Sequence, residues 1–369
     1  MISLITAGAI SMVFTLLLTP LFAKAFRKLK LGQFVRADTP TTHVVKRGTP
    51  SMGGIVFITA SIIGYFLGHM VGGDSVSGSG LLVLAMMAGL GLIGFIDDFL
   101  KVKRKNSLGL AGRYKIVGTV IVAIVFAIIA LRYKDANGRT PASTAISFVR
   151  DLNFDFVVAF GAVAGVIAFV VWVALITTSV SNAVNLTDGL DGLAGGASIL
   201  AIGSYIFIGF WQSSQSCVNP ILPVANVSAC YNVSRPLDLA VVAASVVGSL
   251  VGFLWWNTSP AQITMGDTGS FALGGVLAAL AIVSRTELLL VIIGGLFLVI
   301  TGQVIIQVLY FKATKGKRIW RSSPLHHHFE MKGWPEVTIV VRFWIIAGLF
   351  VALGIGAFYL EWLSRGVAS

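Results

Sequence analysis

Adjacent carboxylates at the end of an apolar stretch are the first residues in this sequence that could do chemistry. Asp97 and Asp98 end the stretch 81–96, which contains no charged residue. Two neighbouring carboxylates repel each other unless a cation or a proton lies between them. Lys101 and Lys103 follow closely, so the aspartates could simply pair with these bases. The alternative is that the two carboxylates help to bind a divalent cation.

A second polar group lies in the segment from Asn182 to Gly192, which contains Asp188 and Asp191 but no basic residue. If the segment is helical, a spacing of three places Asn185 and both aspartates on neighbouring positions. If its glycines form a tight turn instead, the oxygens still converge. Such oxygens are the ligands that Mg²⁺ prefers. The alternative interpretation is an ordinary polar loop.

A third carboxylate, Asp267, lies in the short segment 265–270, where Gly266 and Gly269 flank it ahead of another apolar stretch. A carboxylate beside the backbone N–H groups at the start of a helix suits phosphate or metal binding. The alternative is that Asp267 only caps that helix, a common role for aspartate.

Basic and imidazole side chains form the remaining polar groups. Lys46 precedes Arg47 and the glycine- and hydroxyl-rich segment 48–54, which suits an anionic partner. Segment 324–330 contains three consecutive histidines, namely His326, His327 and His328. Adjacent side chains diverge, so at most two of them could bind one ion, and zinc ligands usually have wider spacing. We favour contact of these histidines with a diphosphate.

Composition indicates that a membrane-embedded scaffold positions these groups. Hydrophobic residues make up 56% of the 369 residues, charged residues make up 11%, and the mean hydropathy is +0.90. A soluble domain carries about 25% charged residues. A helix needs about 20 apolar residues to cross the hydrocarbon core. We therefore predict one all-α, polytopic integral membrane domain over residues 1–369, with ten helices at about residues 2–23, 52–72, 80–99, 115–132, 156–179, 193–211, 238–256, 269–284, 287–311 and 339–363.

The eighth of these spans, 269–284, is the shortest, and Gly274 and Gly275 interrupt it. If it re-enters the membrane without crossing, the number of spans is odd.

Basic residues separate into two sets along the ten spans. Of the 27 Lys and Arg residues, 20 fall in one set of loops. The positive-inside rule makes this set cytosolic and places both termini on the external side. All the polar groups named above fall on the cytosolic face, as do the acids without an obvious partner. The predicted cytosolic loops are at about residues 24–51, 97–115, 180–192, 257–268 and 312–338.

The net charge of +12 then lies on the cytosolic side, where topology and attraction to anionic lipid head groups explain it. This placement argues against a nucleic-acid partner. The two cysteines, Cys217 and Cys230, lie in the predicted external loop 212–238. They could form a disulfide in an oxidising exterior or remain as thiols.

Clustered carboxylates and bases on one membrane face fit Mg²⁺-assisted phosphoryl transfer. A transporter or channel is the rival class, because acids at membrane depth also mark ion pathways. That class predicts carboxylates in the middle of spans, whereas these lie at span ends and in loops.

The motifs together resemble the polyprenyl-phosphate N-acetylhexosamine-1-phosphate transferases across nearly the whole chain. The resemblance is carried by segments 48–54, 97–101, 185–192, 265–270 and 324–330. The last segment discriminates best, and through it the chain resembles the members that act on the muramoyl-pentapeptide nucleotide. A sister enzyme that uses UDP-N-acetylglucosamine for another cell-envelope polymer is the alternative.

The resemblance implies an enzyme of the bacterial plasma membrane whose active site faces the cytoplasm. Undecaprenyl phosphate would attack the β-phosphate of UDP-N-acetylmuramoyl-pentapeptide. The products would be UMP and the first lipid intermediate of peptidoglycan synthesis. The resemblance also implies Mg²⁺ as cofactor and a homodimer, and direct attack is favoured over an aspartyl-phosphate intermediate on Asp98.

Matching positions imply a role for each candidate residue. Asp267 would be the main Mg²⁺ ligand with Asp97 or Asp98 nearby, and Asp97 would deprotonate or orient the lipid phosphate. The implied substrate contacts are Lys101 and Lys115 to phosphates, Lys46, Asn182, Asn185, Asp188 and Asp191 to the nucleotide, and His326, His327 and His328 to the diphosphate or sugar. One departure is Thr264, where many relatives have an aromatic residue that could stack on uracil.

Overall fold

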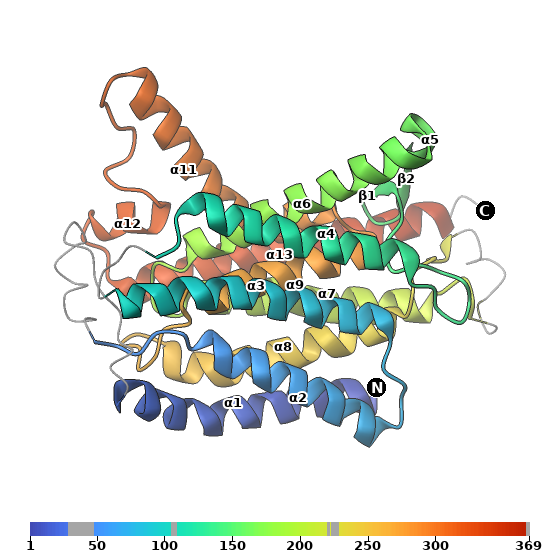
Figure 1. The fold of residues 1–369 in the computed structure, drawn as a ribbon, viewed down its shortest axis with the longest axis horizontal. Helices are drawn as coiled ribbons and strands as arrows, with labels where there is room; N and C mark the ends of the chain where they lie inside the picture. Colours follow the sequence, from blue (N-terminus) through green and yellow to red (C-terminus); the bar gives the residue numbers. More distant parts are fainter. Residues whose placement is uncertain (29–47, 105–108, 220–221, 223–228, 367–369) are drawn as a thin grey trace.

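Thirteen helices and one short hairpin make up the described part of the chain, which comprises residues 1–28, 48–104, 109–219, 222 and 229–366 of the computed structural model (Figure 1). The helices are α1 Ile2–Lys28, α2 Gly54–Gly72, α3 Gly78–Lys103, α4 Gly112–Arg132, α5 Phe156–Phe160, α6 Ala162–Thr187, α7 Leu193–Ser214, α8 Pro236–Asn257, α9 Gly266–Val283, α10 Leu289–Ile293, α11 Gly295–Ala313, α12 Leu325–Glu330 and α13 Glu336–Gly366. The strands β1 Ala145–Ser147 and β2 Asp151–Asp155 pair antiparallel between α4 and α5.

Ten helices in the described residues are long and apolar enough to cross a membrane, which confirms the predicted number of spans. The chain is therefore an all-α, polytopic membrane protein. Figure 1 shows that α1 begins and α13 ends at the same end of the bundle. The ten spans are α1, α2, α3, α4, α6, α7, α8, α9, α11 and α13.

The shortest predicted span is the continuous helix α9, whose side chains are almost all buried. A Cβ atom on Gly274 would lie 2.3 Å from the Cα atom of Ser181, and one on Gly275 would lie 3.0 Å from Leu90 Cδ1. Small residues let helices approach closely in a membrane. These glycines do not interrupt the span, because they let α6 and α3 pack directly against it.

Several helices end at different residues from those that hydropathy predicts. Helix α3 continues to Lys103 and α6 continues to Thr187, so Asp97, Asp98, Asn182 and Asn185 all lie on helices. The predicted span 287–311 is divided at Gly294 into α10 and α11. Hydropathy identifies only the apolar part of a helix. The helices continue beyond it, because their polar end residues find partners in other parts of the fold.

Glycines also bring α2 and α3 against the start of α9. A Cβ atom on Gly94 would lie 2.1 Å from the backbone oxygen of Asp267, and one on Gly54 would lie 2.3 Å from the backbone nitrogen of Gly269. No side chain fits at either position without movement of the backbone. The close crossing at Gly94 places the end of α3 directly beside Asp267.

A buried carboxylate also lies at the opposite end of the bundle. Asp238, in the first turn of α8, accepts hydrogen bonds from Tyr65 Oη at 2.9 Å and from the backbone N–H of Ser77 at 3.2 Å, and lies 2.6 Å from His69 Nε2. The partners of Asp238 are more than 160 residues away in the sequence, so no local pattern indicates that this acid is buried.

The two cysteines form a disulfide, with their Cα atoms 4.9 Å apart. This bond closes the segment between α7 and α8. The guanidinium of Arg150 donates hydrogen bonds to the carbonyl oxygens of Ala229 and Cys230 and lies 4.0 Å from the ring of Tyr231. Of the two alternatives left open by the sequence, a disulfide or two free thiols, the structure contains the disulfide.

Candidate active site

Three carboxylates converge where the last turns of α3 meet the first turn of α9. Asp97 and Asp98 lie on α3, Asp267 lies on α9, and one oxygen from each lies within 4.8 Å of the others. Asp97 is fully buried, and the side chain of Asp267 is 17% exposed. The close approach of α3 and α9 at Gly94 explains how acids from two distant segments come together.

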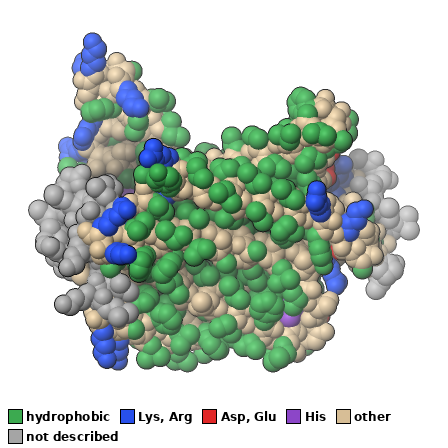
Figure 2. Space-filling model, viewed as in Figure 1, with side chains coloured by type: hydrophobic (Ala, Val, Ile, Leu, Met, Phe, Trp, Pro, Cys, Tyr) green, Lys and Arg blue, Asp and Glu red, His purple; other side chains and the backbone are tan. Residues whose placement is uncertain are grey.

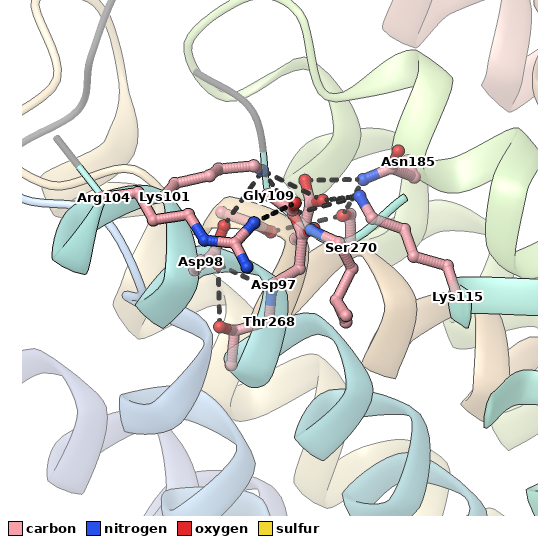
Figure 3. A network of polar contacts seen from close by, with 12 residues as sticks. Asp97, Asp98, Lys101, Arg104, Gly109, Lys115, Asn185, Thr268 and Ser270 are labelled. Carbon is pink, nitrogen blue, oxygen red and sulfur yellow. Dashed lines mark hydrogen bonds and ion pairs between the residues drawn. The ribbon is translucent and has the colours of Figure 1, made fainter. Parts of the chain in front are cut away.

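Two lysines lie among these carboxylates. The Nζ atom of Lys101, on α3, lies 2.6 Å from Asp97 Oδ2 and 3.1 Å from Asp267 Oδ2. The Nζ atom of Lys115, on α4, lies 3.0 Å and 2.6 Å from the same two oxygens. Figure 3 shows both lysines pointing into the cluster from different helices. Three carboxylates and two ammonium groups together carry a formal charge of about −1, which favours binding of a further cation.

Backbone and hydroxyl groups fix the orientation of the α3 carboxylates. The backbone N–H of Leu110 donates to Asp97 Oδ1 at 2.6 Å, and a Cβ atom on Gly109 would lie 2.2 Å from that oxygen. The backbone N–H and the hydroxyl of Thr268 donate to Asp98 Oδ2 at 2.9 and 2.8 Å. Asp98 is therefore tied to α9, and Asp97 is tied to the segment before α4.

Asn185 connects α6 to the same site. Its Nδ2 atom donates to Asp267 Oδ1 at 3.0 Å and to Ser270 Oγ at 2.9 Å. Both amide hydrogens are used, so Asn185 holds Asp267 in one orientation. The sequence predicted a shared site for Asn185 and Asp267, and the structure brings them into contact across 82 positions in the chain.

The donor set fits Mg²⁺, a hard cation that binds carboxylate oxygens. Asp97 Oδ2 lies within ion-pair distance of both lysines, but in the described residues it accepts no hydrogen bond of regular geometry. It is a buried oxygen whose charge the two ammonium groups offset. The residues that could hold the ion are Asp97, Asp98 and Asp267.

A cavity of about 580 Å³ opens beside the cluster. Its volume lies within the range of roughly 300–1,000 Å³ that is usual for small-molecule sites. Three bases and three residues of the carboxylate network face it. The lining residues are Asp97, Leu100, Lys101, Arg104, Gly109, Leu110, Ala111, Tyr114, Lys115, Asn185 and Asp267.

The turn after α6 carries the other predicted carboxylates in different surroundings. Burial and the nearby carboxylates of Asp267 and Asp98 raise the pKa of Asp188 well above its usual value. Asp191 instead joins neighbouring segments, because its Oδ2 atom accepts from the backbone N–H of Ala261 at 3.1 Å and its N–H donates to Glu336 Oε1 at 2.9 Å. Asp191 thus ties the turn to the loop before α9 and to α13.

Among the described residues, Asn182 is a predicted site residue that finds a hydrogen-bond partner within its own helix. Asn182 donates to the carbonyl oxygen of Thr178, one turn earlier in α6, at 2.8 Å. Lys46 lies outside the described residues.

The three histidines have different polar surroundings, although the rings of His326 and His327 lie edge to face with their centroids 4.4 Å apart. His326 is fully buried against the turn after α6, where a Cβ atom on Gly189 would lie 2.1 Å from His326 Nε2. His327 Nδ1 lies 2.5 Å from Glu330 Oε2. His328 Nδ1 accepts a hydrogen bond from the backbone N–H of Arg321 at 3.1 Å. Burial and the neighbouring charges of Lys332 and Arg321 lower the pKa of His328.

Two glutamines in α11 position the histidine segment, and sequence inspection missed them. Gln307 Oε1 accepts hydrogen bonds from the backbone N–H groups of Ile319 and Trp320 at 3.2 and 3.1 Å. Gln303 Nε2 donates to the carbonyl oxygen of Ser322 at 3.5 Å. The segment after α11 therefore runs back along that helix towards α12. Two amides one turn apart in an apolar span were the available signal.

Other contributors to the site lay within or beside the motifs without being singled out. Thr268 and Ser270 belong to segment 265–270, and Arg104 and Gly109 lie near the paired aspartates. Thr268 and Ser270 have partners on other helices, Asp98 and Asn185, so only the fold assigns them a place.

Comparison with known proteins identifies the family of the chain. Residues 80–285, from α3 through α9, match the glycosyl transferase family 4, and this range is more than half of the chain. The class of protein is therefore a family 4 glycosyl transferase. Residues 46–58 match signature 1 of the phospho-N-acetylmuramoyl-pentapeptide-transferases.

Similar proteins narrow the class further. The phospho-N-acetylmuramoyl-pentapeptide-transferase of Clavibacter sepedonicus is 62% identical over 99% of this chain and 100% of its own length. The enzymes of that name from Kineococcus radiotolerans and Renibacterium salmoninarum are 56% and 53% identical, each over 98% of this chain and over 99% and 100% of their own lengths. The chain belongs to the phospho-N-acetylmuramoyl-pentapeptide-transferase family.

Proposed function

We propose that the chain transfers phospho-N-acetylmuramoyl-pentapeptide from its UDP derivative to undecaprenyl phosphate and releases UMP. The product would be the first lipid intermediate of peptidoglycan synthesis. The names of the relatives support the identity of the transferred group. The observation that carries the proposal is the convergence of Asp97, Asp98 and Asp267 with two lysines at the wall of one cavity.

Charge repulsion is the main obstacle to this reaction, because both reacting groups are phosphates. Lys101, Arg104 and Lys115 line the cavity from α3 and α4. In our proposal these bases bind phosphate oxygens and offset the repulsion as the two groups approach. When bound, Mg²⁺ would be held by Asp267 with Asp97 and Asp98 and would neutralise charge on the diphosphate.

Asp97 is our candidate for the group that orients or deprotonates the lipid phosphate. The N–H of Leu110 fixes its Oδ1 atom, and its Oδ2 atom accepts no regular hydrogen bond from the described residues. Asp97 also lines the cavity in which the lipid phosphate would bind.

Asp98 is less suited to act as a nucleophile. Its Oδ2 atom accepts two hydrogen bonds from Thr268, its Oδ1 atom lies 3.4 Å from Lys101 Nζ, and the residue is 4% exposed. These contacts support direct attack of the lipid phosphate over an aspartyl-phosphate intermediate.

The nucleotide would lie on the side of the cavity formed by α6 and the turn after it. We propose Asn185 and Asp188 as its nearest contacts, with Asn182 and Lys46 farther along the same site. Asp191 would act by holding the turn. His326 lies against Gly189 in this turn, which supports a role for the histidine segment near the diphosphate or sugar.

We further propose that the end of the bundle with the carboxylate cluster faces the cytoplasm of a bacterial plasma membrane. The excess of Lys and Arg in the loops at that end supports this orientation, with both termini outside. The sequence resemblance supports a homodimer, which the mass of the detergent-solubilised protein would test.

A UMP-release assay on the purified chain separates this proposal from the alternative. The chain would receive Mg²⁺, undecaprenyl phosphate and either UDP-N-acetylmuramoyl-pentapeptide or UDP-N-acetylglucosamine. We expect UMP release with UDP-N-acetylmuramoyl-pentapeptide and none with UDP-N-acetylglucosamine. Release with only UDP-N-acetylglucosamine would establish the sister enzyme and overturn the proposed substrate.

A further inference from the structure

Helix α11 leaves the bundle and carries basic residues to its far end. Figure 1 shows its C-terminal half projecting away from the other helices, and Figure 2 shows Lys and Arg side chains at the projecting end. We call residues 312–321 the basic tip. Its basic residues are Lys312, Lys315, Lys317, Arg318 and Arg321, and all of them are exposed.

The tip lies where α11 leaves the hydrocarbon of the membrane. The shaft below it exposes apolar side chains, including Ile305, Ile306 and Leu309, as a lipid-facing helix does. Apolar residues continue through Phe311, immediately before Lys312. The tip is thus level with lipid head groups.

The charges of the tip have no carboxylate partner among the residues that the structure describes. None of its five bases forms an ion pair with a carboxylate in the part of the chain that the structure describes. Between residues 311 and 329 the sequence contains no acidic residue. An exposed cluster of this size at the end of a span favours anionic lipid.

Hydrogen bonds to α11 hold the backbone of the basic tip in a defined conformation. Gln307 fixes the backbone of Ile319 and Trp320 against α11 through three hydrogen bonds. The exposed side chains of Phe311 and Ile319 lie among the bases. Arg318 Cζ lies 5.8 Å from the centre of the Phe311 ring. This combination of apolar and cationic groups matches the boundary between acyl chains and phosphates.

We propose that the basic tip of α11 binds the head groups of anionic phospholipids. Five exposed charges spread over ten residues, with no enclosing wall, suit several phosphodiesters of a lipid surface better than one enclosed phosphate. The positive-inside rule explains why these bases are on their side of the membrane. It does not require that the folded tip selects one head group over another.

Quenching of Trp320 fluorescence by brominated lipids tests the selection directly. The full chain would be reconstituted in phosphatidylcholine vesicles that contain an equal minor share of brominated phosphatidylglycerol or brominated phosphatidylcholine. The chain has 8 Trp, so the signal of Trp320 is the difference from the Trp320→Phe variant. That variant keeps the hydrogen bonds to Gln307, because they involve only the backbone of residue 320.

We expect brominated phosphatidylglycerol to quench Trp320 more strongly than brominated phosphatidylcholine. Each base near an anionic surface favours anionic lipid by about fivefold at low salt. The excess should therefore fall sharply in a Lys315→Gln, Lys317→Gln, Arg318→Gln triple variant, which keeps two of the five bases, and should disappear at high salt. An Arg132→Gln, Lys134→Gln control, at the other end of the bundle, should keep the excess. Equal quenching by both lipids, or no quenching by either, would overturn the proposal.

Discussion

Replacement of Asp267 by asparagine tests the carboxylate cluster with the smallest change of shape. The carboxylate lies 3.1 Å from Lys101 Nζ and 2.6 Å from Lys115 Nζ through one oxygen, and the other oxygen accepts from Asn185. Asp267→Asn keeps an acceptor for Asn185 but removes the charge. A cation bound by Asp97, Asp98 and Asp267 would therefore lose one of its three carboxylate ligands.

The expected magnitudes follow from these contacts. Breaking a buried ion pair costs about 3–5 kcal/mol, but both lysines keep Asp97 Oδ2 as a partner. We therefore expect a loss of only about 1–3 kcal/mol in the free energy of unfolding. A metal ion contributes several kcal/mol to transition-state stabilisation. The rate of transfer should accordingly fall by about 10²- to 10⁴-fold.

The assay is UMP release at saturating Mg²⁺ by protein that is still folded at the assay temperature. Asp135→Asn is the matched control, because Asp135 also pairs with a base, Arg139 at 3.0 Å, but lies outside the cluster. The control should keep its transfer rate. A near-normal rate for Asp267→Asn, with an unchanged dependence on Mg²⁺, would refute the metal assignment.

Gly189→Ala should raise KM for the nucleotide with little change in kcat, because the added methyl group would lie 2.1 Å from His326 Nε2 and displace the histidine segment. An unchanged KM in steady-state kinetics would argue against that contact. Gln307→Leu should lower the free energy of unfolding by about 1–3 kcal/mol, because the N–H groups of Ile319 and Trp320 lose their acceptor. Thermal unfolding measures this loss, and an unchanged Tm would contradict it. Asp188→Asn should stabilise the protein at neutral pH. The native pKa of Asp188 is raised above the unfolded value, so the free energy of unfolding of the parent falls as pH rises through that interval. The gain should vanish below the unfolded pKa of about 3.9, and a gain that persists in acid would rule out this cause.

The number of spans could be predicted because a lipid environment demands long apolar helices whatever their packing. The same reasoning misjudged α9. Its glycines at 274 and 275 look like interruptions in the sequence, yet they are the positions at which α6 and α3 touch it. Hydropathy describes contact with lipid, whereas α9 contacts other helices along nearly its whole length.

The residue types of the site could be predicted, but their pairing could not. Paired aspartates and an acidic segment without bases are visible in the sequence because each is unfavourable without a distant partner. The partners themselves, Thr268 for Asp98 and Leu110 for Asp97, are ordinary residues. Asp238 illustrates the converse, because the sequence offers no local sign that it is buried among Tyr65, His69 and Ser77.

The most direct test of the proposed transfer is detection of its lipid product. The purified chain, reconstituted with undecaprenyl phosphate, would receive UDP-N-acetylmuramoyl-pentapeptide with Mg²⁺ or with a chelator, and mass spectrometry would follow the lipid. We predict the lipid-linked diphosphate sugar in amounts equal to UMP, with Mg²⁺ and not with the chelator. Absence of this lipid in the presence of Mg²⁺, from folded protein, would contradict the proposed function.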